Sequence, residues 1–237
     1  GRLQKLSEAI GKDWGVTAEE AADADRAAFL SKSDLATGMV TEFTELQGEM
    51  GKEYALLDGE KPEVAQAIFE QYMPRFAGDI LPEQEIGRAL SLADKLDNLA
   101  ATFLRGLIPT GSQDPFALRR QTIGAVNILT DGKIHWDIRC GIEAALALLP
   151  GDEETKKTVL SQIEDFFRQR IKAIMLDEGI AYDIIDAVLA GPVDDIYALF
   201  LKARSMAESQ LKGEAELRQA VTRLANNTKG KTGGKVD

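Results

Sequence analysis

Apolar residues recur at helical spacing in nearly every segment of this chain, and no segment alternates apolar and polar residues as a half-buried strand does. Prolines and Asp-Gly pairs separate these segments. Aromatic residues make up only 6% of the chain, whereas alanine, leucine, glutamate and lysine recur throughout, a composition typical of packed helices. The sequence therefore predicts an all-α protein, with helices over residues 18–30, 45–57, 62–73, 82–106, 115–129, 140–149, 153–176, 181–190, 194–211 and 214–227.

Cysteine usage and hydropathy indicate where such a protein works. The single cysteine, Cys140, excludes an internal disulfide and favours a reducing compartment. The first segment, GRLQKLSEAIGKDW, carries charges every few residues and has no apolar signal region. The longest apolar run, AALALLP, is far too short to cross a bilayer. We expect a soluble cytoplasmic protein without a membrane partner.

The net charge of −11 argues against a protein that binds nucleic acid over its whole surface. Its distribution is uneven, because residues 1–60 carry −7, residues 61–200 carry −8, and residues 201–237 carry +4. The basic carboxyl-terminal segment can therefore contact a polyanion locally. The simpler interpretation is a solvated helix followed by a lysine-rich tail.

The helix expected over residues 82–106 places a carboxylate among apolar residues. Asp97 falls inside its apolar stripe, and Asp94 lies at the edge. A buried carboxylate must be paired, hydrogen-bonded or metal-bound, because an isolated buried charge is costly. Asp97 is therefore either held by a helix end or an arginine, or it is a metal ligand.

The run SLADKLDNLAATF resembles the last metal-binding motif of the HD phosphohydrolase fold, with Asp94 as the counterpart of the final ligand. In AAFLSKSDLAT, Asp34 matches the aspartate of the His-Asp doublet, but Ser33 stands in place of its histidine. The chain has one histidine, His135, outside both motifs, and we expect it to be an ordinary, partly buried ring. The resemblance implies an HD-like fold whose metal site, at Asp34 and Asp94, is degenerate and holds no metal.

A second resemblance covers most of the chain. The segments LSKSDLATGMVTEFTELQGEMGKEYALLDGE, AIFEQYMPRFAGDILP, LADKLDNLAATF and PTGSQDPFALRR, in this order, resemble the β subunit of bacterial glycyl-tRNA synthetase. The family usually has a histidine where this chain has Gln71. The resemblance implies an α₂β₂ ligase whose α subunit makes glycyl-adenylate with ATP and magnesium, while β binds tRNA(Gly). It implies no catalytic residue and no bound cofactor in this chain.

The resemblance also implies a domain organisation. Family members are much longer, so the chain looks like a fragment that is inactive alone. Residues 1–134 would form the degenerate HD-like domain, and residues 135–237 a helical region that includes the start of an incomplete anticodon-binding domain.

Three functions remain open at this point. The first is a tRNA-binding and subunit-assembling part of a ligase, supported by the ordered motifs and the basic end. The second is an HD-type, metal-dependent nucleotide phosphohydrolase, supported by resemblance of fold alone. The third is a helical scaffold that binds only neighbouring domains. For the first function, the candidate tRNA-binding residues are Arg119, Arg120, Arg218, Arg223 and Lys229.

The stretch PTGSQDPFALRR contains one glycine and no lysine, so it lacks the pattern of a Walker phosphate loop. It fits a helix start instead, with Asp114 as the cap and Pro115 at the first helical position. Consecutive residues cannot both face the core. We therefore expect one of Arg119 and Arg120 at the surface, and the other is a candidate to bind a carboxylate such as Asp97.

Overall fold

The computed structural model describes the backbone of residues 1–228. It also describes their side chains, except those of Glu214, Ala215, Leu217, Arg218, Val221 and residues 224–228. The described part is built of helices and has no strand beyond two isolated bridges, which confirms the all-α prediction. In chain order the elements are α1 (Arg2–Trp14), α2 (Ala18–Leu30), η1 (Ser33–Ala36), α3 (Gly38–Glu42), η2 (Thr44–Leu46), α4 (Glu49–Leu57), α5 (Pro62–Glu70), α6 (Glu85–Leu104), α7 (Leu118–Asp131), α8 (Ile138–Ala147), α9 (Glu153–Asp177), α10 (Tyr182–Leu189) and α11 (Ile196–Thr228).

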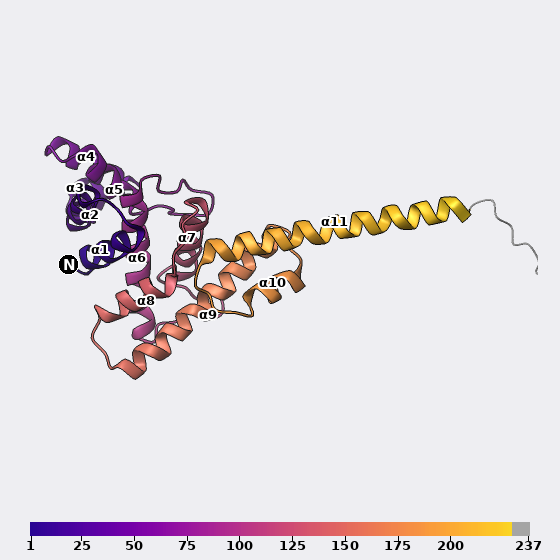
Figure 1. Cartoon of the computed structure of the whole chain (residues 1–237). Coiled ribbons are helices and arrows are strands. Elements are labelled where there is room, and N and C mark those ends of the chain that lie inside the picture. Colours follow the sequence, from indigo (N-terminus) through magenta and orange to yellow (C-terminus); the bar gives the residue numbers. More distant parts are fainter. Residues whose placement is uncertain (229–237) are drawn as a thin grey trace, which may run out of the picture.

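Helix α6 is the centre of the described structure, and α1, α2, α5, α7, α8 and α9 pack around it (Figure 1). Its first turns contribute Ile86 and Leu90 to a smaller apolar core shared with α2 and α5. Its later turns contribute Leu96 and Phe103 to a larger core that extends along the chain to Ala203. One helix therefore joins both cores, and the division of the chain at residue 134 stays a prediction.

Two helices begin later than the sequence predicts. Helix α6 begins at Glu85 rather than Pro82, and α7 begins at Leu118 rather than Pro115. In α7 the physical reason is Ala117, whose φ of 53° is left-handed and cannot belong to a right-handed helix.

Helix α11 is one continuous helix where the sequence predicts two. The expected break lies at residues 212–213, yet Gly213 is helical. A glycine inside a helix costs only about 1 kcal/mol, which does not by itself end a helix. The carboxyl-terminal half of α11 extends away from the other helices (Figure 1).

No helix in the described range 1–228 is both long enough and apolar enough to cross a membrane.

Candidate functional site

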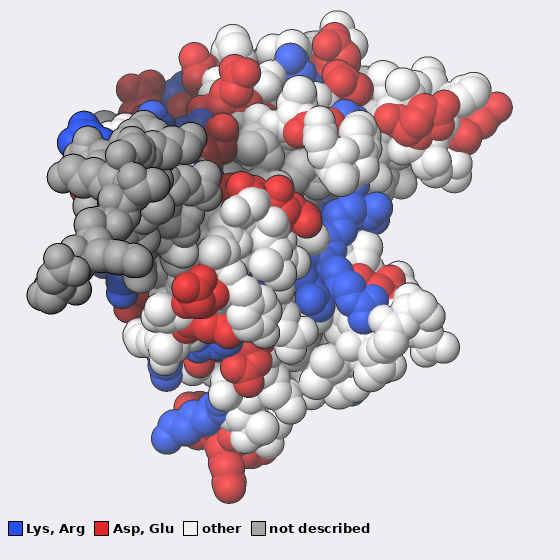
Figure 2. All heavy atoms as spheres, turned by 90° about the vertical axis from the view of Figure 1, so that its right-hand side faces the viewer, with Lys and Arg blue, Asp and Glu red and all other residues white. Residues whose placement is uncertain are grey.

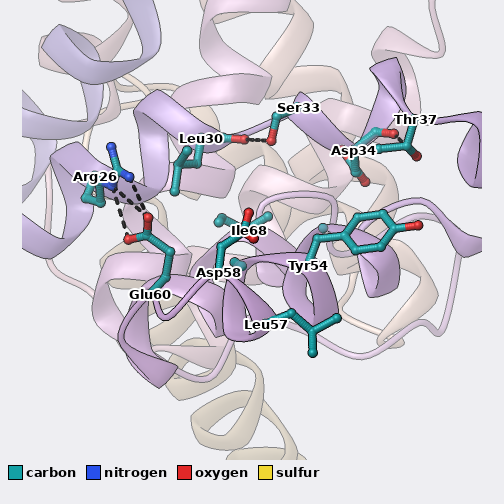
Figure 3. Close-up of a pocket in the computed structure, with 12 residues that line it drawn as sticks. Arg26, Leu30, Ser33, Asp34, Thr37, Tyr54, Leu57, Asp58, Glu60 and Ile68 are labelled. Carbon is teal, nitrogen blue, oxygen red and sulfur yellow. Dashed lines mark hydrogen bonds and ion pairs between the residues drawn. The ribbon is translucent and has the colours of Figure 1, made fainter.

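Asp34 is buried in η1, and protein donors hold its carboxylate. The backbone N–H of Gly48 donates to Oδ2 at 2.7 Å, and the hydroxyl of Tyr72 donates to Oδ1 at 2.8 Å. Figure 3 shows Asp34 beside a hollow of about 670 Å³, whose lining also includes Arg26 and Glu60. Both oxygens of Asp34 are therefore already engaged within the fold.

Asp94, on α6, accepts a hydrogen bond from Nζ of Lys32 and lines a different hollow, of about 370 Å³. The hydroxyl of Tyr72 lies close enough to both Asp34 and Asp94 to be affected by their charges. Burial raises the pKa of Tyr72, and the hydrogen bond to Asp34 and the nearby charges of Asp34 and Asp94 raise it further. The two carboxylates predicted to be degenerate HD positions thus both raise the pKa of the Tyr72 hydroxyl, but they line separate hollows.

Among residues 1–228, no three histidine, cysteine, aspartate or glutamate side chains gather as they would around a metal ion. His135 is exposed, with 60% of its side chain accessible, so the expectation of a partly buried ring is wrong. Its neighbour Trp136 occupies the buried position instead. Nδ1 of His135 lies 2.7 Å from Oδ2 of Asp195, and its ring packs against Tyr197 with centroids 4.9 Å apart.

The buried carboxylate of Asp97 is bound by an arginine, but not by either of the two expected. Nε of Arg2 donates to Oδ1 at 2.8 Å, and Nη2 donates to Oδ2 at 3.0 Å. Neither Arg119 nor Arg120 reaches Asp97, so that suggestion was wrong. The reason is that α1, which the sequence analysis did not predict, packs along α6 and brings Arg2 to it.

The stretch PTGSQDPFALRR is chiefly a helix start. Asp114 accepts hydrogen bonds from the N–H groups of Leu118, at 2.8 Å, and Arg119, at 3.0 Å, so its predicted role as a cap is confirmed. Nη2 of Arg119 donates to the carbonyl oxygen of Gly111 at 2.7 Å, which ties the loop together. Arg120 is exposed and lines the 370 Å³ hollow.

The five candidate tRNA-binding residues fall in two places. Arg119 and Arg120 begin α7 in the body of the molecule. Arg223 is exposed on the part of α11 that extends away from the body (Figure 1). Arg218 lies in the same part of α11, where its side chain is not described, and Lys229 lies outside the described residues. Of the three candidates whose side chains the structure describes, Arg119 and Arg120 therefore do not share a surface with Arg223.

Lysine and arginine side chains gather in a recess of the face shown in Figure 2, with acidic side chains around it. We call the 370 Å³ hollow the basic hollow, because four cations and one carboxylate line it. Its lining residues are Lys32, Leu35, Gln47, Gln71, Tyr72, Pro74, Arg75, Asp94, Lys95, Asn98, Phe116, Ala117, Arg120 and Gln121.

Two buried polar residues line the basic hollow: Lys95, which no sequence motif singled out, and Gln71, which the sequence marked only as a departure from the family pattern. Lys95 on α6 donates from Nζ to the carbonyl oxygen of Met73 and to Oγ of Ser91, both at 2.7 Å. Burial lowers the pKa of Lys95 to about 8. Gln71 follows α5 and is fully buried, and its amide has no hydrogen-bond partner among the described residues. The available signal for Lys95 was its place next to Asp94, within the apolar run LADKL.

Comparison with known proteins identifies the family. The family model described as glycyl-tRNA synthetase beta subunit matches residues 1–190. The chain is 47% identical over 237 residues to the glycine-tRNA ligase beta subunit of Clostridioides difficile (strain 630), covering 100% of this chain and 34% of the relative. It is 44% identical over 232 residues to that of Desulforamulus reducens, covering 96% of this chain and 33% of the relative.

The chain thus spans about a third of the length of the curated relatives it matches. The family match covers both the stretch that carries Asp34 and Asp94 and the start of α7 with Arg119 and Arg120. The chain belongs to the glycyl-tRNA synthetase beta subunit family.

Proposed function

We propose that the chain forms part of the β subunit of a glycine-tRNA ligase and supports the attachment of glycine to tRNA(Gly). The observation that carries this proposal is the family match over residues 1–190. Because the chain spans about a third of its relatives, the activity belongs to the complete assembly. We propose a cytoplasmic heterotetramer of two α and two β subunits.

Within that assembly we assign this chain a non-catalytic role, which is to hold tRNA and to contact the α subunit. ATP and magnesium would be used by the α subunit. The state of the two HD-like carboxylates supports this role, since Asp34 accepts from Gly48 and Tyr72, and Asp94 is paired with Lys32. A nucleotide phosphohydrolase needs ligands free for metal, and this arrangement does not favour that alternative.

The proposed organisation keeps residues 1–134 as a degenerate HD-like domain and assigns residues 135–237 to a helical region that leads into an anticodon-binding domain. Arg119 and Arg120 are the proposed tRNA contacts in the body, and Arg218, Arg223 and Lys229 those of the carboxyl-terminal end. The positive charge of residues 201–237, within an otherwise acidic chain, supports the second group.

The test uses a complete β subunit that contains this sequence, assembled with its α subunit. The assembly should aminoacylate tRNA(Gly), and the α subunit alone should still form glycyl-adenylate. Arg120→Gln and Arg223→Glu should raise the KM for tRNA, and their effect should shrink as salt rises. Arg105→Gln removes the same charge from the exposed end of α6 and is the matched control. If adenylate formation by the α subunit required residues of this chain, the non-catalytic assignment would be wrong.

A further inference from the structure

Phe76 presents an aromatic ring to solvent from a turn that is held in place. The backbone N–H and Nε of Arg75 donate to Oδ2 of Asp79, at 2.8 and 3.0 Å, and the N–H of Asp79 donates to the carbonyl oxygen of Phe76 at 3.3 Å. Phe76 is nevertheless 55% exposed. The turn therefore fixes the backbone that carries the ring, and the ring itself is free to contact another molecule.

A hollow of about 610 Å³ lies beside this ring, between the turn and the first half of α7. We call it the aromatic hollow. Its apolar surface comes from Phe76 together with Pro74, Ala77, Ala117 and Ile123. The volume falls in the range of ligand sites, and the apolar lining suits the flat face of a nucleic-acid base.

Arg119 and Arg120 bring positive charge to the aromatic hollow. Arg120 is exposed and makes no ion pair with the described part of the chain, and Nη2 of Arg119 donates only to a neutral acceptor, the carbonyl oxygen of Gly111. The lining contains one carboxylate, Asp114, and both of its oxygens accept from N–H groups at the start of α7. A phosphate at this hollow would therefore meet a guanidinium that has no counterion within the described fold.

Asn127 adds an amide that the fold leaves unused. It lies on α7, lines the aromatic hollow and is partly exposed. Its side chain makes no hydrogen bond with any described residue, and neither of its polar atoms is among the buried, unpaired ones. An amide offers two donors and an acceptor, which are the groups that pair with the edge of a base.

A ring, an amide and an arginine in one hollow match the way in which proteins bind unpaired nucleotides. Bases of single-stranded RNA stack on aromatic rings, their edges form hydrogen bonds, and cationic side chains bind the backbone phosphates. In a duplex the faces of the bases are covered, so a duplex would leave Phe76 unused.

We propose that the aromatic hollow holds an unpaired nucleotide of tRNA, with its base on Phe76, the edge of that base on Asn127 and its phosphate on Arg120. The proposal rests on the proposed function, from which it takes tRNA as the ligand. It adds that the contact is made with a single-stranded part of the tRNA.

The experiment measures the Kd of the complete assembly of α and β subunits for tRNA(Gly), by fluorescence anisotropy at several salt concentrations. Phe76→Leu keeps an apolar side chain but removes the aromatic face, so it should raise the Kd about fivefold or more. Phe76→Tyr keeps the aromatic face and should stay within about twofold of the native Kd.

Salt dependence separates the base contact from the phosphate contact. Phe76→Leu removes no charge and should leave the slope of log Kd against log salt unchanged, whereas Arg120→Gln should reduce that slope by about 0.7, as expected for one phosphate of a single strand. Asn127→Ala should raise the Kd by about two- to tenfold, since it removes one or two hydrogen bonds to the base. Asn127 loses no hydrogen bond within the described fold, so this variant should remain folded, which a thermal melt verifies.

Phe29→Leu is the matched control. Phe29 is 63% exposed, and like Phe76 it has a guanidinium carbon 5.7 Å from its ring centroid. Its arginine, Arg26, is paired with Glu60, and Phe29 does not line the aromatic hollow. This change should leave the Kd for tRNA(Gly) unchanged.

The proposal is overturned, while the proposed function stands, if the native assembly charges tRNA(Gly) and neither Phe76→Leu nor Asn127→Ala changes the Kd. It is also overturned if Phe76→Leu weakens the association of α with β in place of tRNA binding, because the hollow is then a protein contact. The same holds if Phe76→Leu weakens only the binding of free adenosine monophosphate. A native assembly that does not aminoacylate tRNA(Gly) at all would instead overturn the proposed function, and this proposal with it.

Discussion

Arg2 and Asp97 form a two-pronged ion pair across 95 residues of chain, which fastens α1 to the buried face of α6. The hydrogen bonds and the charge of Asp97 raise the pKa of the Arg2 guanidinium. Half of the Arg2 side chain is exposed, whereas only 10% of the Asp97 side chain is. The pair therefore contributes to stability mainly because Arg2 supplies hydrogen bonds and a counterion to a carboxylate that water reaches poorly.

Arg2→Gln should accordingly lower the free energy of unfolding by about 1–2 kcal/mol, because it leaves the Asp97 charge without its counterion. Urea unfolding at pH 7 measures the change. Lys5→Gln, an exposed change on the same helix, should have little effect. In a double-mutant cycle, Asp97→Asn should recover part of the loss; a purely additive cycle would show that the pair contributes nothing.

Gly87 is required by the close approach of Glu70. The Glu70 carboxylate accepts from the N–H groups of Glu83 and Gln84, both at 3.2 Å, next to the start of α6. A Cβ on residue 87 would lie 1.9 Å from Oε2 of Glu70. Gly87→Ala should therefore destabilise the protein by about 1–3 kcal/mol, as overpacking usually does.

The measurement is the denaturation midpoint of Gly87→Ala. Its control is Gly38→Ala in α3, where a Cβ meets nothing within 4 Å, and this change should be neutral or slightly stabilising. Equal midpoints for the two variants would contradict the packing argument.

Asp114→Ala removes the cap of α7 and should cost about 1 kcal/mol. In the complete synthetase the melting temperature should fall, with little change in the kinetics of aminoacylation at temperatures well below it. Asp58→Ala removes an exposed aspartate at the end of α4 and serves as the control. A large rise in KM for tRNA without loss of stability would instead assign the loop a direct contact.

The buried ammonium of Lys95 makes the free energy of unfolding depend on pH, and the lowered pKa of Lys95 determines the direction of that dependence. Its pKa is about 8 in the folded protein, below the ordinary 10.5. Between these values the unfolded chain binds more protons, so the folded state gains stability as pH rises through this window. Below about pH 8 the full cost of burying the charge is present.

Compared with Lys95→Met, the native protein should therefore gain about 2 kcal/mol between pH 7.5 and pH 10. In the native protein Oγ of Ser91 also donates to the Met73 carbonyl oxygen, at 2.6 Å, so this acceptor should keep a donor in Lys95→Met. Urea unfolding across this range measures the difference, and Lys12→Met, at an exposed position, should show no such trend. A constant difference between the native protein and Lys95→Met would mean that Lys95 titrates normally.

The helical fold was predictable because apolar spacing is a local signal. The capping box that Thr17 and Glu20 form at the start of α2 is a local pattern of the same kind. The helix boundaries were harder to predict, since proline permits a helix start without requiring one. The left-handed backbone of Ala117, which delays the start of α7, depends on tertiary structure. Helix α1 was missed although Leu3, Leu6 and Ile10 have helical spacing and Gly15 follows.

For the candidate site, only the identity of two residues was predictable from the sequence, and their surroundings were not. Motifs singled out Asp34 and Asp94, but no local pattern shows which hollow each side chain lines. The partner of Asp97 was unpredictable because it lies 95 residues away. The unpaired amide of Gln71 is a property of packing, and sequence spacing carries no information about it.

Because α11 is one uninterrupted helix, a small change in its direction moves its far end by a larger distance. At 1.5 Å per residue, its 33 residues span about 50 Å. Only about 30 Å of that length lies beyond the contacts with the other helices, so a tilt of about 10° where α11 leaves them would displace its far end by about 5 Å. Small repacking at the base of α11 is thereby amplified at the end that carries Arg223, so the position of this arginine reports on the packing of the helices beneath it.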